Sequence, residues 1–321
     1  MSPALTLPAL LFVSEVDGGP EVHRRETDGS VSALTTRPGA DWAGPVSPDG
    51  RSALVVSEVP GGLQLRTIPT AGGTARDLGG VVDRVQSASW SPDGRFVVAA
   101  VTTTGRTELQ RLSPTTGATR TLWRPEQGAF DPVVTPDASS VVFVSAGPAG
   151  PDLWTMPAAG GTPTLLLTAP GEQLAPRCSP SGERIAYLTT ESGPLELRTV
   201  SASGAGARIA WRPAAGDGEA VPEAGLHWSP DGTRIALVRR TADGTSSVAV
   251  VDVRRGVRVL DTIRDADLSA QTPAWIDPER LVVAGTVDGD LELFVIQDEA
   301  VPIRLTHRPG ADWLPRVVPA P

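Results

Sequence analysis

The stretch Trp90-Ser91-Pro92-Asp93-Gly94, followed by the apolar run Phe96–Ala100, sets the pattern of this chain. The unit returns as Ser47-Pro48-Asp49-Gly50, Thr135-Pro136-Asp137, Ser179-Pro180-Ser181-Gly182 and Trp228-Ser229-Pro230-Asp231-Gly232, and in weaker form as Trp275-Ile276-Asp277-Pro278-Glu279 and Val317-Val318-Pro319. The anchor prolines 48, 92, 136, 180, 230, 278 and 319 are 44, 44, 44, 50, 48 and 41 residues apart. A period of about 40–50 residues with short strands inside each unit is typical of a β-propeller.

One unit read in full contains four strands. Residues 176–179 form a short strand, and Pro180-Ser181-Gly182 is a turn in which proline fixes φ and glycine accepts the left-handed conformation. Residues 184–189, 195–200 and 207–211 then read as three further strands separated by Gly- and Ser-rich turns. Four antiparallel strands linked by hairpins make one propeller blade.

The two ends of the chain hold complementary fragments of a blade. The sequence near Leu10–Ser14 matches a second strand without a first, whereas Pro315–Pro319 matches a first strand with nothing after it. We therefore predict seven four-stranded blades in a single domain over residues 1–321, with a closing blade built from about 10–36 and 314–319. Three N-terminal strands plus one C-terminal strand would remove the open edge of the ring.

A nine-residue segment that occurs twice also supports this closure. Leu34-Thr35-Thr36-Arg37-Pro38-Gly39-Ala40-Asp41-Trp42 returns almost unchanged as Leu305-Thr306-His307-Arg308-Pro309-Gly310-Ala311-Asp312-Trp313. Together with Leu226–Ala236, these segments resemble the WD40-like repeat of TolB-type β-propellers. The resemblance covers essentially the whole chain, but the N-terminal domain of TolB has no counterpart here. It implies a rigid scaffold that binds other proteins, often in the bacterial envelope; the same repeat also forms lids on serine peptidases and, in a few members, a metal-dependent lyase.

Composition narrows the classes of partner. The net charge of -9 and pI near 4.9 argue against a nucleic-acid partner, which would call for a basic face. No stretch approaches the roughly 20 apolar residues of a membrane span. No signal peptide is recognisable, which predicts a cytoplasmic protein, or a periplasmic or cell-envelope protein if a leader has been removed. We expect a soluble monomer whose partner is another protein.

One position of the repeat contains the candidate ligand-binding residues. Trp90, Trp228 and Trp275 share a site that is apolar in other units and therefore predicts a core between blades. The residues just before it are Pro45, Ser89, Val133, Arg177, His227, Ala274 and Arg316. Because innermost strands line the channel, Arg177, His227 and Arg316 are either an anion site at the channel mouth or partners in hydrogen bonds between blades. The second interpretation is favoured, since buried polar groups normally find partners.

A partner-binding rim is the second candidate. It comprises Asp41, Trp42, His307, Arg308, Asp312 and Trp313, because the position of the two tryptophans varies in other units (Gln86, Phe130, Leu174, Ala224, Gln271). Exposed aromatic residues are favoured contact residues. The alternative is that Trp42 and Trp313 plug the blade junction where the ring closes. The loop Gly216–Glu223, which lengthens one interval to 50 residues, is a further candidate contact.

No catalytic constellation emerges from the sequence. Cys178 occupies the core position and is expected to be a buried filler rather than a nucleophile. The aspartates Asp49, Asp93 and Asp231 are expected to form turns rather than a carboxylate cluster. His23, His227 and His307 are too scattered to indicate a metal site, and the acidic segments 216–219 and 265–267 lack the spacing of a calcium loop.

The sequence predicts no cofactor and leaves a divalent cation open. The preferred interpretation is a protein–protein interaction scaffold. The alternative is a small-ligand or sugar-acid binding protein, or a lyase- or hydrolase-like enzyme, that uses the central channel.

Overall fold

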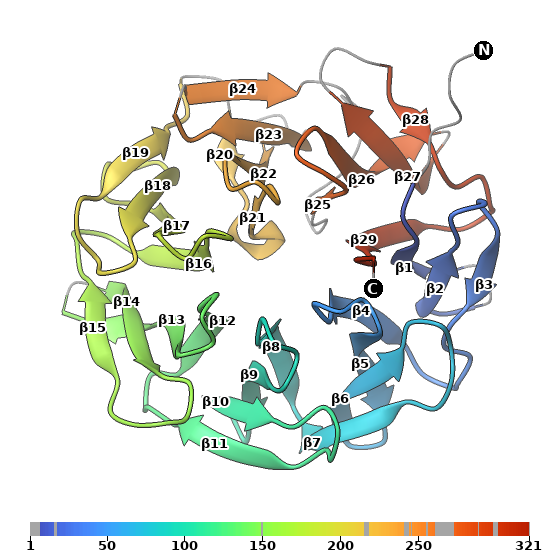
Figure 1. The fold of residues 1–321 in the computed structure, drawn as a ribbon, viewed down its shortest axis with the longest axis horizontal. Coiled ribbons are helices and arrows are strands. Elements are labelled where there is room, and N and C mark those ends of the chain that lie inside the picture. The colour runs from blue at the N-terminus through green and yellow to red at the C-terminus, as the bar shows by residue number, and fades with distance from the viewer. Residues whose placement is uncertain are drawn as a thin grey trace.

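The computed structural model describes residues 7–15, 18–148, 150–214, 218–240, 244, 246–254, 256–260, 273–287, 289–297 and 301–320. Its strands form seven antiparallel sheets placed in a ring around a central opening (Figure 1). The predicted all-β, seven-bladed propeller is therefore confirmed. The innermost strand of each sheet faces the opening, and the C-terminal end of the chain lies at its inner edge beside β29 (Figure 1).

The closing blade combines both ends of the chain, as predicted. Its strand order is β29-β1-β2-β3, with β1 at Leu10–Ser14, β2 at Glu21–Arg25, β3 at Val31–Ala33 and β29 at Asp312–Val317. β29 pairs antiparallel with β1, placing Val13 opposite Trp313 and Leu11 opposite Arg316. The first and last strands of the chain therefore share one ladder, and the ring has no open seam at this point.

The other six blades follow the chain in order. The first of them contains β4 (Asp41–Val46), β5 (Ser52–Val59), β6 (Gly62–Pro69) and β7 (Arg76–Val82). The second contains β8 (Arg84–Trp90), β9 (Val97–Thr103), β10 (Arg106–Leu112) and β11 (Thr119–Trp123). The third contains β12 (Ala129–Val134), β13 (Ser140–Gly147), β14 (Gly150–Pro157) and β15 (Thr164–Leu167). The fourth contains β16 (Gln173–Cys178), β17 (Arg184–Thr189), β18 (Glu196–Ser201) and β19 (Arg208–Trp211). The fifth contains β20 (Glu219–Ala220), β21 (Leu226–Trp228), β22 (Arg234–Arg240), β23 (Ser246–Asp252) and β24 (Gly256–Leu260). The sixth contains β25 (Ala274–Trp275), β26 (Arg280–Val287), β27 (Asp290–Gln297) and β28 (Ile303–Arg304).

One blade departs from the four-strand pattern. Its innermost strand is split into β20 and β21, which both pair with β22. The short 3-10 helix η1 (Pro222–Ala224) lies between the two pieces. The longest interval of the repeat, 50 residues, ends at this blade, so its added residues enter the innermost strand.

The repeated turns fold as their chemistry predicts. The hydroxyl of Ser91 donates to Asp93 Oδ1 (2.7 Å) and accepts a hydrogen bond from the Phe96 backbone N–H (3.0 Å). The same pair of bonds joins the first strand to the second at Ser47, Thr135 and Ser229. These hydrogen bonds lower the pKa of the turn aspartates, to about 2 for Asp137. The aspartates are turn formers, as expected.

The hydrophobic core lies between blades rather than inside one centre. Seven clusters of buried apolar residues each draw side chains from two adjacent sheets, one cluster for each junction of the ring. At the closing junction, Val13 and Val22 pack with Ala53, Val55 and Ile68 of the next blade. Burial at every junction holds each blade against both neighbours, which fixes the innermost strands around the channel.

Candidate functional site

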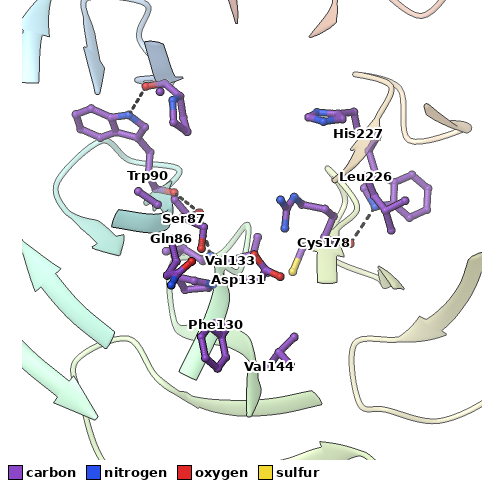
Figure 2. A pocket seen from close by; sticks show the side chains of 18 of the residues that line it. Gln86, Ser87, Trp90, Phe130, Asp131, Val133, Val144, Cys178, Leu226 and His227 are labelled. Carbon is purple, nitrogen blue, oxygen red and sulfur yellow. Dashed lines mark hydrogen bonds between the residues drawn. The ribbon is translucent and has the colours of Figure 1, made fainter. Parts of the chain in front are cut away.

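The innermost strands enclose a central cavity of about 1570 Å³. All seven residues of the repeat position singled out above line it: Pro45, Ser89, Val133, Arg177, His227, Ala274 and Arg316. His227 lies on one side of the opening and Trp90 and Gln86 on the other, while the Cys178 side chain points toward Phe130 and Val144 (Figure 2). The structure therefore brings the three predicted polar residues to one cavity.

Bulges in the innermost strands orient these side chains. The register shifts between Leu174 and Arg177 in β16 and between Phe130 and Val133 in β12. Ala175, Asp131 and Leu314 share one repeat position in these bulges and have positive φ angles of 49°, 48° and 51°. A bulge turns the residues that follow it away from the regular alternation of the strand. The backbone therefore sets the direction of the side chain at the repeat position, which lies two residues later.

Arg177 reaches toward the neighbouring blade. A Cβ atom built on Gly225 would lie 3.1 Å from Arg177 Nη2 and 3.7 Å from His227 Nε2. Gly225 has a φ of 70°, so glycine suits both the backbone and the space there. Arg177 Nη1 donates to its neighbour's carbonyl, Pro176 O, at 2.7 Å. The guanidinium and the imidazole therefore lie close together across the junction of two blades.

The basic groups perturb one another. Burial, followed by the positive charge of Arg177, lowers the pKa of His227 to about 3. Burial and the charge of Arg177 also lower the pKa of Arg316, to about 10. His227 Nε2 lies 3.1 Å from the Ala224 carbonyl oxygen, which accepts hydrogen bonds only. We assign the Nε2–H tautomer, with a neutral imidazole whose Nδ1 is an acceptor at neutral pH.

Three tryptophans lock adjacent blades together next to this cluster. The indole N–H of Trp228 donates to the Arg177 carbonyl (3.0 Å), and that of Trp275 donates to the His227 carbonyl (2.8 Å). Trp90 makes the equivalent bond to Pro45 (3.0 Å). The prediction that this position belongs to the core between blades is confirmed. The backbone of the residues lining the channel is thereby fixed.

Cys178 lies beside Arg177 and also lines the cavity. Burial raises the pKa of its thiol to about 12, although the charge of Arg177 opposes this rise. At neutral pH the group is a thiol and a poor nucleophile.

The six predicted rim residues divide into two sets. Asp41 and Asp312 are fully buried and lie 3.5 Å and 3.7 Å from the guanidinium groups of Arg37 and Arg308. Burial raises the pKa of Asp312. These aspartates support the rim and present no surface to a partner. His307 is exposed, and Trp42, Arg308 and Trp313 are half-buried.

Three aromatic residues occupy one position around the rim. In their ladders, Trp42 lies opposite Val56, Phe130 opposite Val144 and Trp313 opposite Val13. Trp313 packs against the apolar clusters on both sides of the closing blade, as the plug interpretation required. Phe130 lines the cavity. All three residues are half-buried.

The segment Gly216–Glu223 was predicted as a contact loop on one rim. In its described part, Glu219 and Ala220 pair with β22, and Pro222 and Glu223 line the cavity. Residues 216–217, the acidic segment 265–267 and Gln271 lie outside the described residues.

Within the described part of the chain, no three His, Cys, Asp or Glu side chains gather as a metal site would require. In the same residues, no helix has the length and apolar character that a membrane crossing needs.

The sequence analysis did not single out a set of carboxylates, most of them buried, that recurs on the third strands of the blades. Glu21 and Glu292 accept hydrogen bonds from the hydroxyls of Thr35 and Thr306, the threonines of the repeated Leu-Thr segment. Each threonine oxygen also accepts a backbone N–H at 2.9 Å. In other blades, Glu108 pairs with Arg124, and Glu196 with Arg212. The recurring acid in segments such as Asp290-Leu291-Glu292-Leu293 was the available signal.

Comparisons with known proteins agree with this architecture. The sequence model of the family described as "Lipoprotein LpqB beta-propeller domain" matches residues 106–299, more than half of the chain. The Tol-Pal system protein TolB of Anaeromyxobacter dehalogenans (strain 2CP-C) is 33% identical over 92 residues. That alignment spans 29% of this chain and 21% of the curated relative, well under two thirds of its length.

Solved structures of several functions share the fold. TolB from Acinetobacter baumannii superposes with a TM-score of 0.63 at 15% identity, over 97% of this chain and 83% of that one. Oligogalacturonate lyase in complex with manganese gives 0.73 at 17% identity, over 90% and 86%. Puromycin hydrolase gives 0.71 at 18% identity, over 94% of this chain and 52% of that one. At such identities these similarities show the fold alone.

Proposed function

The chain belongs to the family of the lipoprotein LpqB β-propeller domain, as a TolB-like propeller, and we propose that it is a non-catalytic scaffold that binds another protein. The observation that carries this proposal is the set of half-buried aromatic residues Trp42, Phe130 and Trp313. They share one position on a closed ring whose backbone is fixed by packing at every junction. Aromatic residues on a rigid support lose little conformational entropy on binding and are favoured anchors.

The surroundings of the rim suit a protein contact. His307 is exposed beside the half-buried Arg308, and the Arg308 guanidinium lies 5.7 Å from the centre of the Phe12 ring. Arg308 Nη2 also donates to Ser14 Oγ at 3.1 Å. The rim therefore combines apolar rings with polar groups that are already held in place, the mixture found in the cores of protein interfaces.

The relatives also support a role in binding another protein. The curated relative is a protein of the Tol-Pal system, and the family is defined on the propeller of a lipoprotein. Both similarities fit a bacterial protein that works as part of an assembly. We extend to this chain the role in an assembly, without assigning a particular partner.

Affinity capture from cells that produce the protein tests the proposal. The full chain, W42A and I209A are immobilised at equal density; Ile209 is 50% exposed on the outer strand β19 and serves as the control. We expect the same proteins to be retained by the full chain and by I209A, and to be lost from W42A. Equal retention by W42A and the full chain, or no specific retention by either, would contradict a binding rim at Trp42.

A further inference from the structure

Two arginines face the central cavity at one level of the ring. Pro45, Ser89 and Val133 contribute uncharged side chains from three consecutive blades. Arg177, His227, Ala274 and Arg316 follow on the next four, so that Arg177 and Arg316 stand three blades apart. The protein as a whole carries a net charge of -9, so two guanidinium groups facing its central cavity run against its overall balance.

The guanidinium of Arg177 is positioned over the next blade. It occupies the space left by the absent side chain of Gly225, close to His227 Nε2. Among the described residues no carboxylate oxygen lies within 4 Å of it, and its Nη1 donates to the Pro176 carbonyl. A guanidinium in this situation keeps donors available for an oxyanion, which its planar fork can bind through two parallel hydrogen bonds.

Arg316 adds a second positive charge from the closing blade. Its Nη1 donates to the Pro315 carbonyl at 3.2 Å, and its charge and that of Arg177 act on the same imidazole. An anion between the two guanidinium groups would interact favourably with both charges. Ala274 lies on the blade between those of His227 and Arg316 and contributes only a small side chain to the wall.

His227 supplies a different function. Its Nε2–H faces the Ala224 carbonyl, so Nδ1 carries the lone pair. In Figure 2 the ring lies at the edge of the opening. A neutral acceptor beside two cations accepts a hydrogen bond from a hydroxyl group rather than binding the charge itself.

We propose that Arg177, Arg316 and His227 form a binding site for a small, doubly charged oxyanion that also carries a hydroxyl group. Hydroxydicarboxylates and sugar phosphates share this chemistry. The two guanidinium groups bind the anionic oxygens, and the imidazole accepts from the hydroxyl. The cavity of about 1570 Å³ exceeds the few hundred Å³ that such a ligand needs, so the ligand fills only part of the channel. This inference stands apart from the protein-binding rim.

Calorimetric titration of the full chain tests the site with malate, succinate and glycerol 3-phosphate. We expect malate, glycerol 3-phosphate or both to bind with one site per chain, and succinate, which lacks the hydroxyl, to bind several-fold more weakly than malate. Binding of malate alone identifies a carboxylate ligand, and binding of glycerol 3-phosphate alone identifies a phosphate ligand. If neither binds at millimolar concentration, or if succinate equals malate, the proposal is overturned.

Matched variants locate the site within the channel. R177M and R316M each remove one guanidinium and are expected to weaken binding by about tenfold or more. R84M is the control, because Arg84 lines the same cavity at the start of β8, five residues before Ser89 and about 16 Å away along the strand. An equal loss in R84M would show that only the general potential of the channel attracts the anion, and would overturn the assignment.

Two further variants test the geometry of the Arg177 guanidinium and the role of the His227 imidazole. R177K keeps the charge but not the fork, and we expect it to bind more weakly than the full chain and more tightly than R177M. H227F should abolish the difference between malate and succinate. Circular dichroism of each variant confirms the fold before titration. If H227F retains the preference for malate, the role given to the imidazole is wrong.

Discussion

At the residue scale, the channel shows how burial and neighbouring charge set the protonation of a single side chain. His227 is neutral at physiological pH because its surroundings in the cavity wall disfavour the charged ring and the positive charge of Arg177 adds to this, which together lower its pKa to about 3. The hydrogen bond to the Ala224 carbonyl opposes this shift but does not overcome it. A histidine with a lowered pKa is protonated more readily in the unfolded chain, so acid favours unfolding through this group.

Replacing His227 should therefore reduce the acid sensitivity of the protein. The unfolded imidazole titrates near pH 6.5 and the folded one near pH 3, so its contribution to stability is lost as the pH falls through that window. Between pH 7 and pH 5 the loss should be about 2 kcal/mol in the natural chain and absent in H227Q. Urea unfolding at both pH values measures it. The exposed His307 provides the control variant H307Q, and an equal benefit from both variants would contradict the assignment.

The thiol of Cys178 should be unreactive for a related reason. With the pKa raised to about 12, very little thiolate is present at pH 8. We expect iodoacetamide to alkylate the folded chain about 100-fold more slowly than the urea-unfolded chain. Mass spectrometry of timed samples gives both rates. Comparable rates would mean that Cys178 is neither as buried nor as neutral as described.

At the scale of elements, the innermost strands are tied to one another by tryptophan side chains. Each indole bond spans a blade junction and ends on the carbonyl of a residue that lines the channel. Rigid walls follow from this arrangement, because a strand cannot shift without breaking a bond to its neighbour.

Loss of one such bond should be measurable. W228F keeps the ring in the junction but leaves the Arg177 carbonyl without its donor, and we expect a loss of about 1–3 kcal/mol in the free energy of unfolding. W154F is the matched control, because among the described residues the Trp154 indole N–H has no hydrogen-bond partner. Chemical denaturation compares the two. Equal losses would show that ring packing, and not the hydrogen bond, accounts for the effect.

At the scale of the whole molecule, stability depends on the closure of the ring. The ladder between β1 and β29 joins the two ends of the chain, and apolar clusters lie on both sides of that blade. Without β29, the edge of β1 and the faces of two neighbouring blades would meet water.

A chain that ends at Ala311 should therefore lose cooperative stability. We expect its melting temperature to fall by about 10 °C or more, or the chain to dimerise through the exposed edge of β1. A synthetic peptide of residues 312–320 should bind the truncated chain and restore the melting temperature, whereas a scrambled peptide should not. Light scattering and thermal unfolding provide the readouts. An unchanged melting temperature after truncation would show that the ring does not depend on this ladder.

The repeat made the fold predictable to the level of the closing blade, because turn chemistry and strand spacing are local properties of sequence. The convergence of Arg177, His227 and Arg316 on one cavity followed from their shared repeat position. Other features depend on contacts that sequence spacing does not specify. The burial of Asp41 and Asp312 arises from pairing with Arg37 and Arg308, and the split of the innermost strand into β20 and β21 depends on where the extra residues fit.

Contact between the rim at Trp42 and another protein can be tested directly in cells. A photo-crosslinking amino acid is placed at position 42 in one variant and at position 209 in another, and cells that produce each variant are irradiated. We predict a discrete crosslinked adduct with a second protein from position 42 and none from the outer strand at position 209. Adducts of equal yield from both positions, or an adduct from position 209 alone, would contradict it.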